Sequence, residues 1–258
     1  MPASDLDLLI DAARAAGVIA TRFVGPDAAI WDKPGGAGPV TEADIAVNDM
    51  LESTLKTARP EYGWLSEETE DSTDRLSKEN VFIIDPIDGT RSFVEGSKTW
   101  AHALAVAQNG IVTAAAIYLP MRNKLYSAAA GQGAFLNGAP IRPTSAVDLT
   151  GAQVLAARPN LDKHHWPRGV PQIERAYRPS LAYRLALVAE GRFDAMLTLR
   201  DSWEWDIAAG DLILREAGAL CTDKTGAPLR FNNPRPMLKG VISGGRTLHG
   251  RIIDALSL

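Results

Sequence analysis

Residues 82–90 read Phe-Ile-Ile-Asp-Pro-Ile-Asp-Gly-Thr, and this stretch decides how the rest of the chain is interpreted. Its three leading apolar residues predict a buried strand. Asp85 and Asp88 fall where that strand ends, and the proline between them turns the chain. Gly89 and Thr90 suit the start of a helix, where backbone N–H groups and the helix dipole attract an anion. Two acids able to hold hard cations beside a phosphate-binding turn indicate metal-assisted phosphate chemistry.

The same stretch also has a purely structural interpretation, because acids at a strand-to-helix turn often cap backbone N–H groups. Three further segments favour the chemical interpretation: Thr-Glu-Ala-Asp at 41–44, Ser-Glu-Glu-Thr at 66–69 and Trp-Asp-Ile-Ala-Ala-Gly at 205–210. Thr41 and Asp44 have the spacing of a helix capping box, so this pair taken alone could be structural.

In this order, the four segments resemble the fingerprints of the inositol monophosphatase superfamily, which comprises Mg²⁺-dependent, lithium-sensitive phosphatases. Ser66 departs from the glycine usual in that family. The resemblance implies an α/β fold, a layered α/β/α/β/α sandwich. We expect an N-terminal α+β half, residues 1–142, to carry most metal ligands and the phosphate-binding turn. The C-terminal α/β half, residues 143–258, would carry Asp206 and the substrate specificity.

Composition limits the class of protein and its partners. The chain has 258 residues, 46% hydrophobic and 22% charged, which is ordinary for a soluble globular protein. A net charge of −4 gives no reason to expect a nucleic acid polymer or a membrane as partner. The single cysteine, Cys221, excludes an internal disulfide and fits a reducing compartment. We therefore expect a cytoplasmic protein without a signal peptide, and the resemblance adds a homodimer.

Hydrophobic periodicity and turn residues predict alternating elements. The segment at 31–39 is predicted to be a Gly/Pro-rich loop and 70–80 a polar surface segment. Strands with turns at Asn109-Gly110 and Asn137-Gly138 are predicted between 81 and 142, and further strands at 193–199 and 241–243. Helices are predicted at 4–23, from 41 onward, and at 180–190, 204–217 and 246–256.

The resemblance assigns a set of metal ligands. It implies two or three Mg²⁺ ions, for which Mn²⁺ could substitute. Asp85 would bridge two ions, and Glu67 and the backbone carbonyl of Ile87 would complete the first site. Asp88 and Asp206 would complete the second.

It also assigns catalytic roles. The nucleophile would be a water activated by the first ion, so no phosphoenzyme is expected. Glu67 and the Thr90 hydroxyl would orient this water, and Asp44 would accept the Thr90 hydrogen bond. The phosphate would be held by Asp88, Gly89 and Thr90. Of the adjacent pair of glutamates, we expect Glu68 to face solvent.

The substrate is less constrained. Inositol monophosphatases carry a glutamate seven positions before the aspartate of Trp-Asp, and Leu199 occupies that position here. Ser-Leu-Ala-Tyr at 180–183 and Glu-Trp-Asp at 204–206 resemble the bacterial 3′(2′),5′-bisphosphate nucleotidase branch. We therefore expect hydrolysis of adenosine 3′,5′-bisphosphate to AMP and phosphate. Inositol 1-phosphate is the first alternative, followed by histidinol phosphate and fructose 1,6-bisphosphate. A pseudoenzyme acting as an interaction module is disfavoured because every motif residue is present.

Candidate substrate-binding residues follow from the same reasoning: Ser180, Arg178, Leu199 and Arg200. A second phosphate needs a cation, and the candidates are Arg158, Arg168, Arg175, Arg178 and Arg200. The segment 163–168 is either a lid or a solvated loop. His102 is predicted to be a core histidine.

Overall fold

The computed structural model describes residues 3–24, 29–32 and 39–256. Ser4 and Thr41 cap the first two helices through their side chains, as their residue types predict. Within the described residues the α-helices are α1 (Asp5–Ala20), α2 (Glu42–Ala58), α3 (Thr90–Val94), α4 (Leu181–Ala189), α5 (Ala208–Ala217) and α6 (Arg246–Leu256).

The described strands form two main sheets and two small pairs. The larger sheet joins β3 (Gly63–Ser66), β4 (Asn80–Asp88), β5 (Ala101–Gln108), β6 (Ile111–Leu119), β7 (Lys124–Ala129), β8 (Ala134–Leu136) and β9 (Ala139–Pro140), in that order. The smaller sheet, in the order β11-β10-β12-β16-β14, contains β10 (Gln153–Leu155), β11 (Glu174–Ala176), β12 (Ala195–Thr198), β14 (Leu220–Thr222) and β16 (Val241–Gly244). The pairs are β1 (Ile30–Asp32) with β2 (Pro39–Thr41), and β13 (Ser202–Trp203) with β15 (Met237–Leu238).

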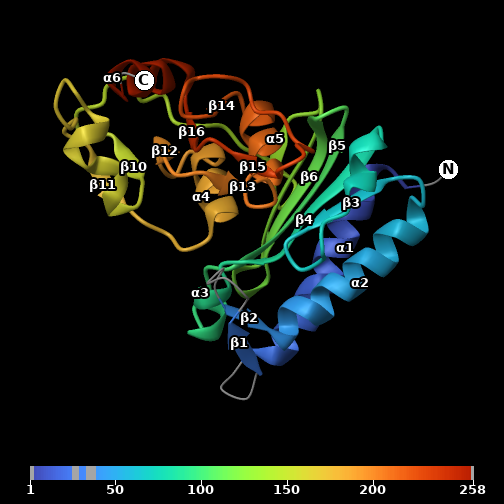
Figure 1. Cartoon of the computed structure of the whole chain (residues 1–258). Coiled ribbons are helices and arrows are strands. Elements are labelled where there is room, and N and C mark those ends of the chain that lie inside the picture. The colour runs from blue at the N-terminus through green and yellow to red at the C-terminus, as the bar shows by residue number, and fades with distance from the viewer. Residues whose placement is uncertain (1–2, 25–28, 33–38, 257–258) are drawn as a thin grey trace.

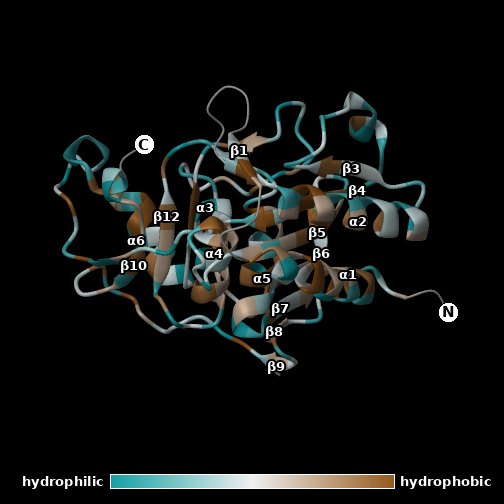
Figure 2. Cartoon of the chain, turned by 90° about the horizontal axis from the view of Figure 1, so that it is seen from below, coloured by the Kyte–Doolittle hydropathy of each residue, from teal (hydrophilic) through white to brown (hydrophobic). Residues whose placement is uncertain are grey.

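Helices and sheets alternate in five layers (Figure 1). Helices α1 and α2 contact one face of the larger sheet, and α5 contacts its other face. Helix α4 packs on α5 and on the smaller sheet, whose strand β16 contacts α6. Figure 2 shows the same succession from another direction, with hydrophobic residues dense in the central elements. The predicted α/β/α/β/α sandwich is confirmed.

Hydrophobic contacts between the layers follow the alternation of side chains along the strands. On β4, Phe82 packs toward α1 and α2, whereas Ile83 belongs to the core around α4 and α5. On β12, Met196 joins that central core, and Leu197 packs toward α6. Gly210 permits close packing of α5 on α4, because a Cβ there would lie 2.4 Å from a Leu185 methyl carbon.

Most predicted elements appear within one or two residues of their expected bounds, with three differences. The helix predicted from 204 starts only at Ala208, because the buried Glu204 holds the chain in a turn by contacts described below. The loop predicted at 31–39 includes strand residues at both ends, and 33–38 lie outside the described residues. The segment 70–80 is polar, but Arg75 within it is buried.

The proposed division near residue 142 falls between β9 and β10, and so between the two main sheets. One hydrophobic cluster extends from Leu65 to Val241 and includes side chains from both halves. The assignment of separate roles to the halves stays a prediction. Among the described residues, no helix combines the length and apolar character needed to cross a membrane.

Candidate metal centre

The first carboxylates of the site stand at the carboxyl ends of two parallel strands. Ser66, the last residue of β3, pairs with Ile84 of β4, so Glu67 and Asp85 follow side by side. The backbone N–H of Glu67 still donates to the Ile84 carbonyl at 3.2 Å. Strand order and register therefore bring together two acids that are far apart in the sequence.

A bulge in β4 separates Asp85 from Asp88. Asp85 pairs with Ala103 and Asp88 with Ala101, and the pairing register shifts between them. The carbonyl of Pro86 contacts Nδ1 of the fully buried His102. His102 is thus a core residue, as predicted, and it supports the bulge through the Pro86 carbonyl. Bulges of this kind re-aim side chains near active sites.

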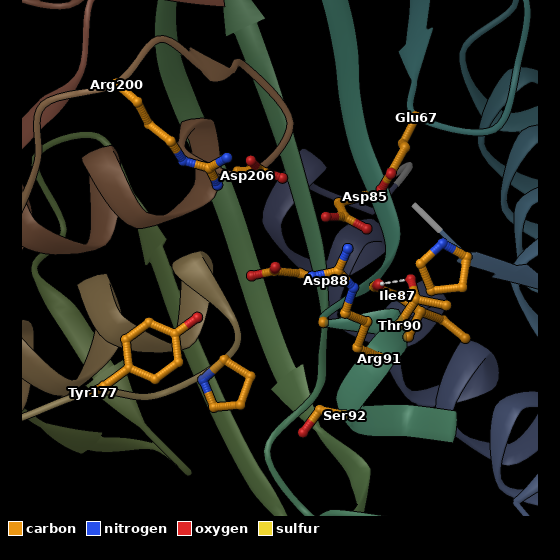
Figure 3. A pocket seen from close by; sticks show the side chains of 13 residues that line it. Glu67, Asp85, Ile87, Asp88, Thr90, Arg91, Ser92, Tyr177, Arg200 and Asp206 are labelled. Atoms are coloured by element: carbon orange, nitrogen blue, oxygen red, sulfur yellow. Dashed lines mark hydrogen bonds between the residues drawn. The ribbon is translucent and has the colours of Figure 1, made fainter. Parts of the chain in front are cut away.

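Three acids meet in one cavity (Figure 3). Asp85, Asp88 and Asp206 each offer a carboxylate oxygen, and these atoms lie within 4.8 Å of one another. The cavity has a volume of about 300 Å³ and is also lined by Glu67, Ile87, Gly89, Thr90, Arg91, Ser92, Tyr177, Pro179, Arg200 and Pro39. The structure thus brings together all five residues predicted as metal ligands, whereas Glu68 does not line the cavity.

The crowding of these acids is electrostatically costly without a cation. Burial raises the pKa of Asp85 well above its usual value, and the charges of Glu67, Asp88 and Asp206 raise it further. Burial likewise raises the pKa of Asp206, with Asp88 and Glu67 adding to the effect and Arg200 opposing it. Within the described chain, Oδ1 of Asp85 is buried without a hydrogen-bond partner. An oxygen donor set with an unsatisfied buried atom fits Mg²⁺, which prefers oxygen ligands.

Asp88 has a second function that sequence reasoning missed. Its Oδ2 accepts hydrogen bonds from the Ser180 hydroxyl and the Ala182 N–H, both at 2.6 Å. Its Oδ1 accepts from the Leu181 N–H at 3.3 Å. A carboxylate at a helix N-terminus satisfies otherwise unpaired N–H groups and favours the dipole. Asp88 therefore attaches the bulge of β4 to the start of α4.

Ser180 is consequently not part of the cavity wall. It is fully buried, donates to Asp88 and accepts from the Tyr183 N–H at 2.9 Å, as the N-cap of α4. The structure gives this predicted substrate-binding residue the position of a helix cap behind the site. The capping pattern of a serine before an apolar helix was the available signal.

Thr90 and Asp44 are joined as the resemblance implies. The Thr90 hydroxyl lies 3.3 Å from Oδ1 of Asp44 and 3.2 Å from the Ile87 carbonyl. The other oxygen of Asp44 accepts from the backbone and the hydroxyl of Thr41, which completes a capping box. Asp44 therefore caps α2 with one carboxylate oxygen and contacts Thr90 with the other. Gly89 has φ +99°, a conformation that favours glycine, and this places Thr90 at the start of α3.

A second cavity of about 430 Å³ adjoins the first and shares Arg91, Tyr177 and Arg200 with it. Its other lining residues include His165, Arg184, Leu199, Asn160 and Thr198. We call it the cationic recess, because it carries three arginines. The predicted residues Leu199 and Arg200 both line it, and so does His165 from the segment 163–168.

Arg184 is the most unusual residue of the cationic recess, since it is a charged side chain buried on an apolar helix. Its exposure is 6%, and burial lowers its pKa. Its Nε donates to the Ser180 carbonyl at 3.3 Å, and its guanidinium lies 5.3 Å from the Tyr177 ring centroid. Among the described residues no carboxylate forms an ion pair with it. A lone arginine among the apolar residues of α4 was the sequence signal for this position, and sequence reasoning missed it.

The other predicted cations lie elsewhere. Arg178 donates to the Tyr177 carbonyl and lies over the Phe193 ring, outside both cavity linings. Arg175 donates to the Ala156 carbonyl, and Arg168 lines a separate hollow beside α6. Of the five arginines expected to meet a second phosphate, Arg200 alone lines the two cavities described here.

Comparisons with known proteins agree with this architecture. A profile of the inositol monophosphatase family matches residues 3–257. The Nus factor SuhB of Escherichia coli K12 is 32% identical, over 86% of this chain and 85% of that protein. An inositol-1-monophosphatase of Mesorhizobium japonicum is 29% identical, over 97% of this chain and 95% of that protein.

Solved structures give the same result. An IMPase of Thermotoga maritima has a TM-score of 0.84 and 28% identity, covering 97% of this chain and 96% of its own. The extragenic suppressor protein SuhB of Bartonella henselae has a TM-score of 0.83 and 30% identity, with 97% of both chains covered. The profile spans nearly the whole sequence and includes every residue that lines the acidic cavity. The chain therefore belongs to the inositol monophosphatase family and is a phosphatase of that family.

Proposed function

We propose that this protein hydrolyses a small phosphate monoester with the help of Mg²⁺ held in the acidic cavity. The observation that carries the proposal is the convergence of Asp85, Asp88 and Asp206, whose carboxylate oxygens lie within 4.8 Å of one another. Buried carboxylates at this density are retained when a cation compensates their charge. In this proposal the metal also stabilises the fold.

In this proposal the site holds two or three ions, and the ligands divide between two positions. Glu67, Asp85 and the Ile87 carbonyl would hold one ion, and Asp85, Asp88 and Asp206 the other. When bound, Mg²⁺ polarises the phosphate and lowers the pKa of a water molecule.

Residues of the chain itself orient the reacting water. The Thr90 hydroxyl donates to Asp44, so its oxygen lone pair can accept a hydrogen bond from the water. Glu67, which also lines the acidic cavity, accepts a second one. The water oxygen attacks phosphorus in line, the ester P–O bond breaks, and the leaving alkoxide takes up, through a neighbouring water, the proton that the attacking water releases. The products are an alcohol and inorganic phosphate, without a phosphoenzyme.

The turn at Gly89 and Thr90 is proposed to bind the phosphate, together with Asp88 through the metal. Arg91 lies next to this turn and lines both cavities. The phosphate is thus flanked by the acidic cluster on one side and a cation on the other.

For the substrate, we favour a compound with a second anionic group, adenosine 3′,5′-bisphosphate. The support is the cationic recess, in which Arg184 and Arg200 lie beside the apolar side chain of Leu199. Charge-assisted hydrogen bonds from arginine suit a phosphate, and an apolar wall suits a base or ribose edge. Leu199 cannot make hydrogen bonds to a ring of inositol hydroxyls.

Inositol 1-phosphate is the second candidate, and a specific observation favours it. The relatives from Mesorhizobium japonicum and Rhizobium meliloti carry the name inositol-1-monophosphatase, the latter with 36% identity over 74% of both chains. Other relatives carry the name Nus factor, so the absence of a nucleic acid partner remains a prediction. Inhibition by Li⁺ and a homodimer are likewise proposed.

The test is a comparison of kcat/KM for adenosine 3′,5′-bisphosphate, inositol 1-phosphate, histidinol phosphate and fructose 1,6-bisphosphate, measured as phosphate release with Mg²⁺. We expect the first to be the best substrate, chelation to abolish turnover, and Mn²⁺ to restore it. A higher kcat/KM for inositol 1-phosphate replaces the substrate proposal with the second candidate. Full turnover in excess chelator contradicts the metal mechanism, and no hydrolysis of any ester supports an interaction module.

A further inference from the structure

A buried arginine, Arg75, connects two segments that the proposed metal site needs at a fixed spacing. It lies in the polar segment between β3 and β4, yet its side chain is only 1% exposed. Its Nε and Nη2 donate to the two carboxylate oxygens of Asp71, at 2.6 and 2.7 Å. A planar guanidinium bound to both oxygens of one carboxylate is fixed in direction as well as in distance.

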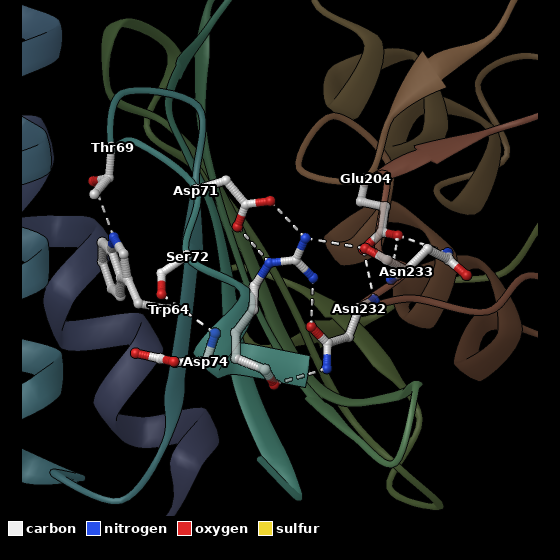
Figure 4. Close-up of polar contacts among 9 residues, drawn as sticks. Trp64, Thr69, Asp71, Ser72, Asp74, Glu204, Asn232 and Asn233 are labelled. Atoms are coloured by element: carbon white, nitrogen blue, oxygen red, sulfur yellow. Dashed lines mark hydrogen bonds and ion pairs between the residues drawn. The ribbon is translucent and has the colours of Figure 1, made fainter. Parts of the chain in front are cut away.

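The same guanidinium also binds the C-terminal half (Figure 4). Its Nη1 donates to Oδ1 of Asn232 at 2.7 Å, and its Nη2 donates to the Asn233 carbonyl at 3.0 Å. The side-chain amide of Asn232 donates back to the Arg75 carbonyl at 3.1 Å. Arg75 therefore holds two asparagines that are more than 150 residues away in the sequence.

These asparagines in turn hold Glu204, which is fully buried. Its Oε2 accepts from the backbone N–H of Asn232 at 2.6 Å. Its Oε1 accepts from the backbone and the side-chain amide of Asn233, at 3.0 and 2.7 Å. Glu204 lies two residues before Asp206, within the turn that precedes α5. The contacts of Glu204 thus fix the turn that presents Asp206 to the acidic cavity.

At the other end, Asp71 lies four residues after Glu67. Between them, the Thr69 hydroxyl accepts hydrogen bonds from Asn48 and Trp64, both at 3.1 Å. The segment after Glu67 is therefore attached through Thr69 to Asn48 of α2 and Trp64 of β3, and through Asp71 to Arg75. Close packing fixes Arg75 itself, because a Cβ on Gly63 would lie 3.1 Å from its Cα.

We propose that Arg75 is a positioning residue, which sets the spacing between Glu67 and Asp206 and thereby the affinity of the site for divalent cations. It touches neither residue and acts through Asp71 on one side and through the asparagines and Glu204 on the other. Partners that orient metal ligands from outside typically change metal affinity about 10–100-fold. The inference rests on the proposed metal-dependent function.

The experiment measures Mn²⁺ binding by calorimetry to wild-type protein and to Arg75→Met, Arg75→Lys, Glu204→Gln and Arg215→Met. Arg215 is the matched control, because it also pairs with an aspartate four residues earlier, Asp211, and donates to a distant carbonyl. It lies outside the acidic cavity. Arg75→Met and Glu204→Gln should weaken binding about tenfold, with Arg75→Lys between them and wild type. Arg215→Met should change it less than about twofold.

The outcomes separate this inference from the proposed function. If Arg75→Met does not fold, Glu204→Gln carries the test, because it preserves the shape of the side chain. Wild-type affinity in the folded Arg75 and Glu204 variants overturns the inference, and so does an equal loss in Arg215→Met. Absence of Mn²⁺ binding by the wild-type protein overturns the proposed function instead.

Discussion

The acidic cavity and the cationic recess adjoin each other, but they are built in different ways. The acidic cavity takes its carboxylates from strand ends and turns, within short motifs that are visible in the sequence. The cationic recess takes Arg91 from helix α3, Arg184 from the interior of α4 and Arg200 from the loop between β12 and β13, with no common motif. Residues that share one ion must have fixed types and geometry, whereas an anion can be met by cations from many positions. We therefore propose that the first region sets the chemistry and that the second sets the choice of substrate.

The largest effect should come from Asp85→Asn, which removes the charge of the ligand proposed to be shared by both ions. We expect kcat/KM to fall by at least about 10³-fold, the upper range for losing one electrostatic contact to a transition state. Steady-state phosphate release with saturating Mg²⁺ measures it. A loss below about tenfold would mean that the acidic cavity does not define the chemistry.

The same substitution should have the opposite effect on stability without metal. Burial and neighbouring acids raise the pKa of Asp85, so folding of the metal-free protein is favoured when this group is protonated. Stability should therefore fall as pH rises above the ordinary range of a carboxyl group, and Asn removes this loss. In excess chelator near pH 8, thermal unfolding should show a higher Tm for Asp85→Asn than for wild type. A lower Tm would show that the acids are compensated without a cation.

His102, which contacts the bulge of β4, should contribute a stability term of the opposite sign. Burial lowers its pKa to about 4 from an ordinary value of 6.5. The neutral ring therefore stabilises the fold fully above pH 6.5, and this contribution is lost as pH falls toward 4. Denaturant unfolding in chelator at pH 7 and pH 4 should show a loss on the order of 3 kcal/mol that is absent in His102→Gln. Equal losses in the two proteins would exclude His102 as the cause.

The cationic recess should be tested with a pair of arginines whose guanidinium groups each lie over an aromatic ring. Arg184 lies 5.3 Å from the Tyr177 ring centroid and lines the recess, whereas Arg178 lies 5.4 Å from the Phe193 ring centroid outside it. Arg184→Met should raise KM for adenosine 3′,5′-bisphosphate about 10–100-fold, the worth of a hydrogen bond to a charged group. Its effect on inositol 1-phosphate should be small, and Arg178→Met should leave both substrates nearly unchanged. Equal effects of Arg184→Met on the two esters would contradict the proposal that Arg184 binds a second anionic group of the substrate.

The smallest effect should come from Glu68→Gln, compared with Glu67→Gln. Only Glu67 lines the acidic cavity, although the two residues are adjacent. We expect kcat/KM to fall more than about 100-fold for Glu67→Gln and less than about twofold for Glu68→Gln. The apparent Mg²⁺ activation constant should rise in Glu67→Gln alone. Similar losses in both variants would show that the boundary of the cavity is misassigned.

The same contrast explains what the sequence could predict. The strand at 82–84, the bend at Pro86 and the aspartates around it follow from local chemistry, and the family fingerprints extend this to Glu67 and Asp206. The capping of α4 by Asp88 depends instead on the docking of two distant segments. The buried position of Arg75, inside a polar stretch, likewise depends on partners near residue 232. Neither the capping of α4 by Asp88 nor the burial of Arg75 is marked by a hydrophobic period or by a sequence motif. Only the structure reveals these two features.

The helix start was misplaced for a related reason. The sequence predicts a helix that includes Trp205 and Asp206, but the side chain of Glu204 forms its hydrogen bonds with residues beyond α5 and holds the chain in a turn. Tertiary contacts outweighed local helix propensity at this point. The deviation from local preference coincides with the residue that the site needs, as is common at functional positions.

The bond between Asp88 and the start of α4 has a consequence for how the protein matures. Its partners are 92 residues apart, and Asp206 follows later still in the chain. During synthesis, the N-terminal sheet emerges long before the groups that complete its acidic edge. Contacts of such large sequence separation form late, because the intervening chain must first be closed into a loop. If the acidic cavity binds an ion as proposed, its acquisition would be one of the last events of biogenesis, and a ribosome-bound fragment lacking α4 and α5 would have no completed site to fill.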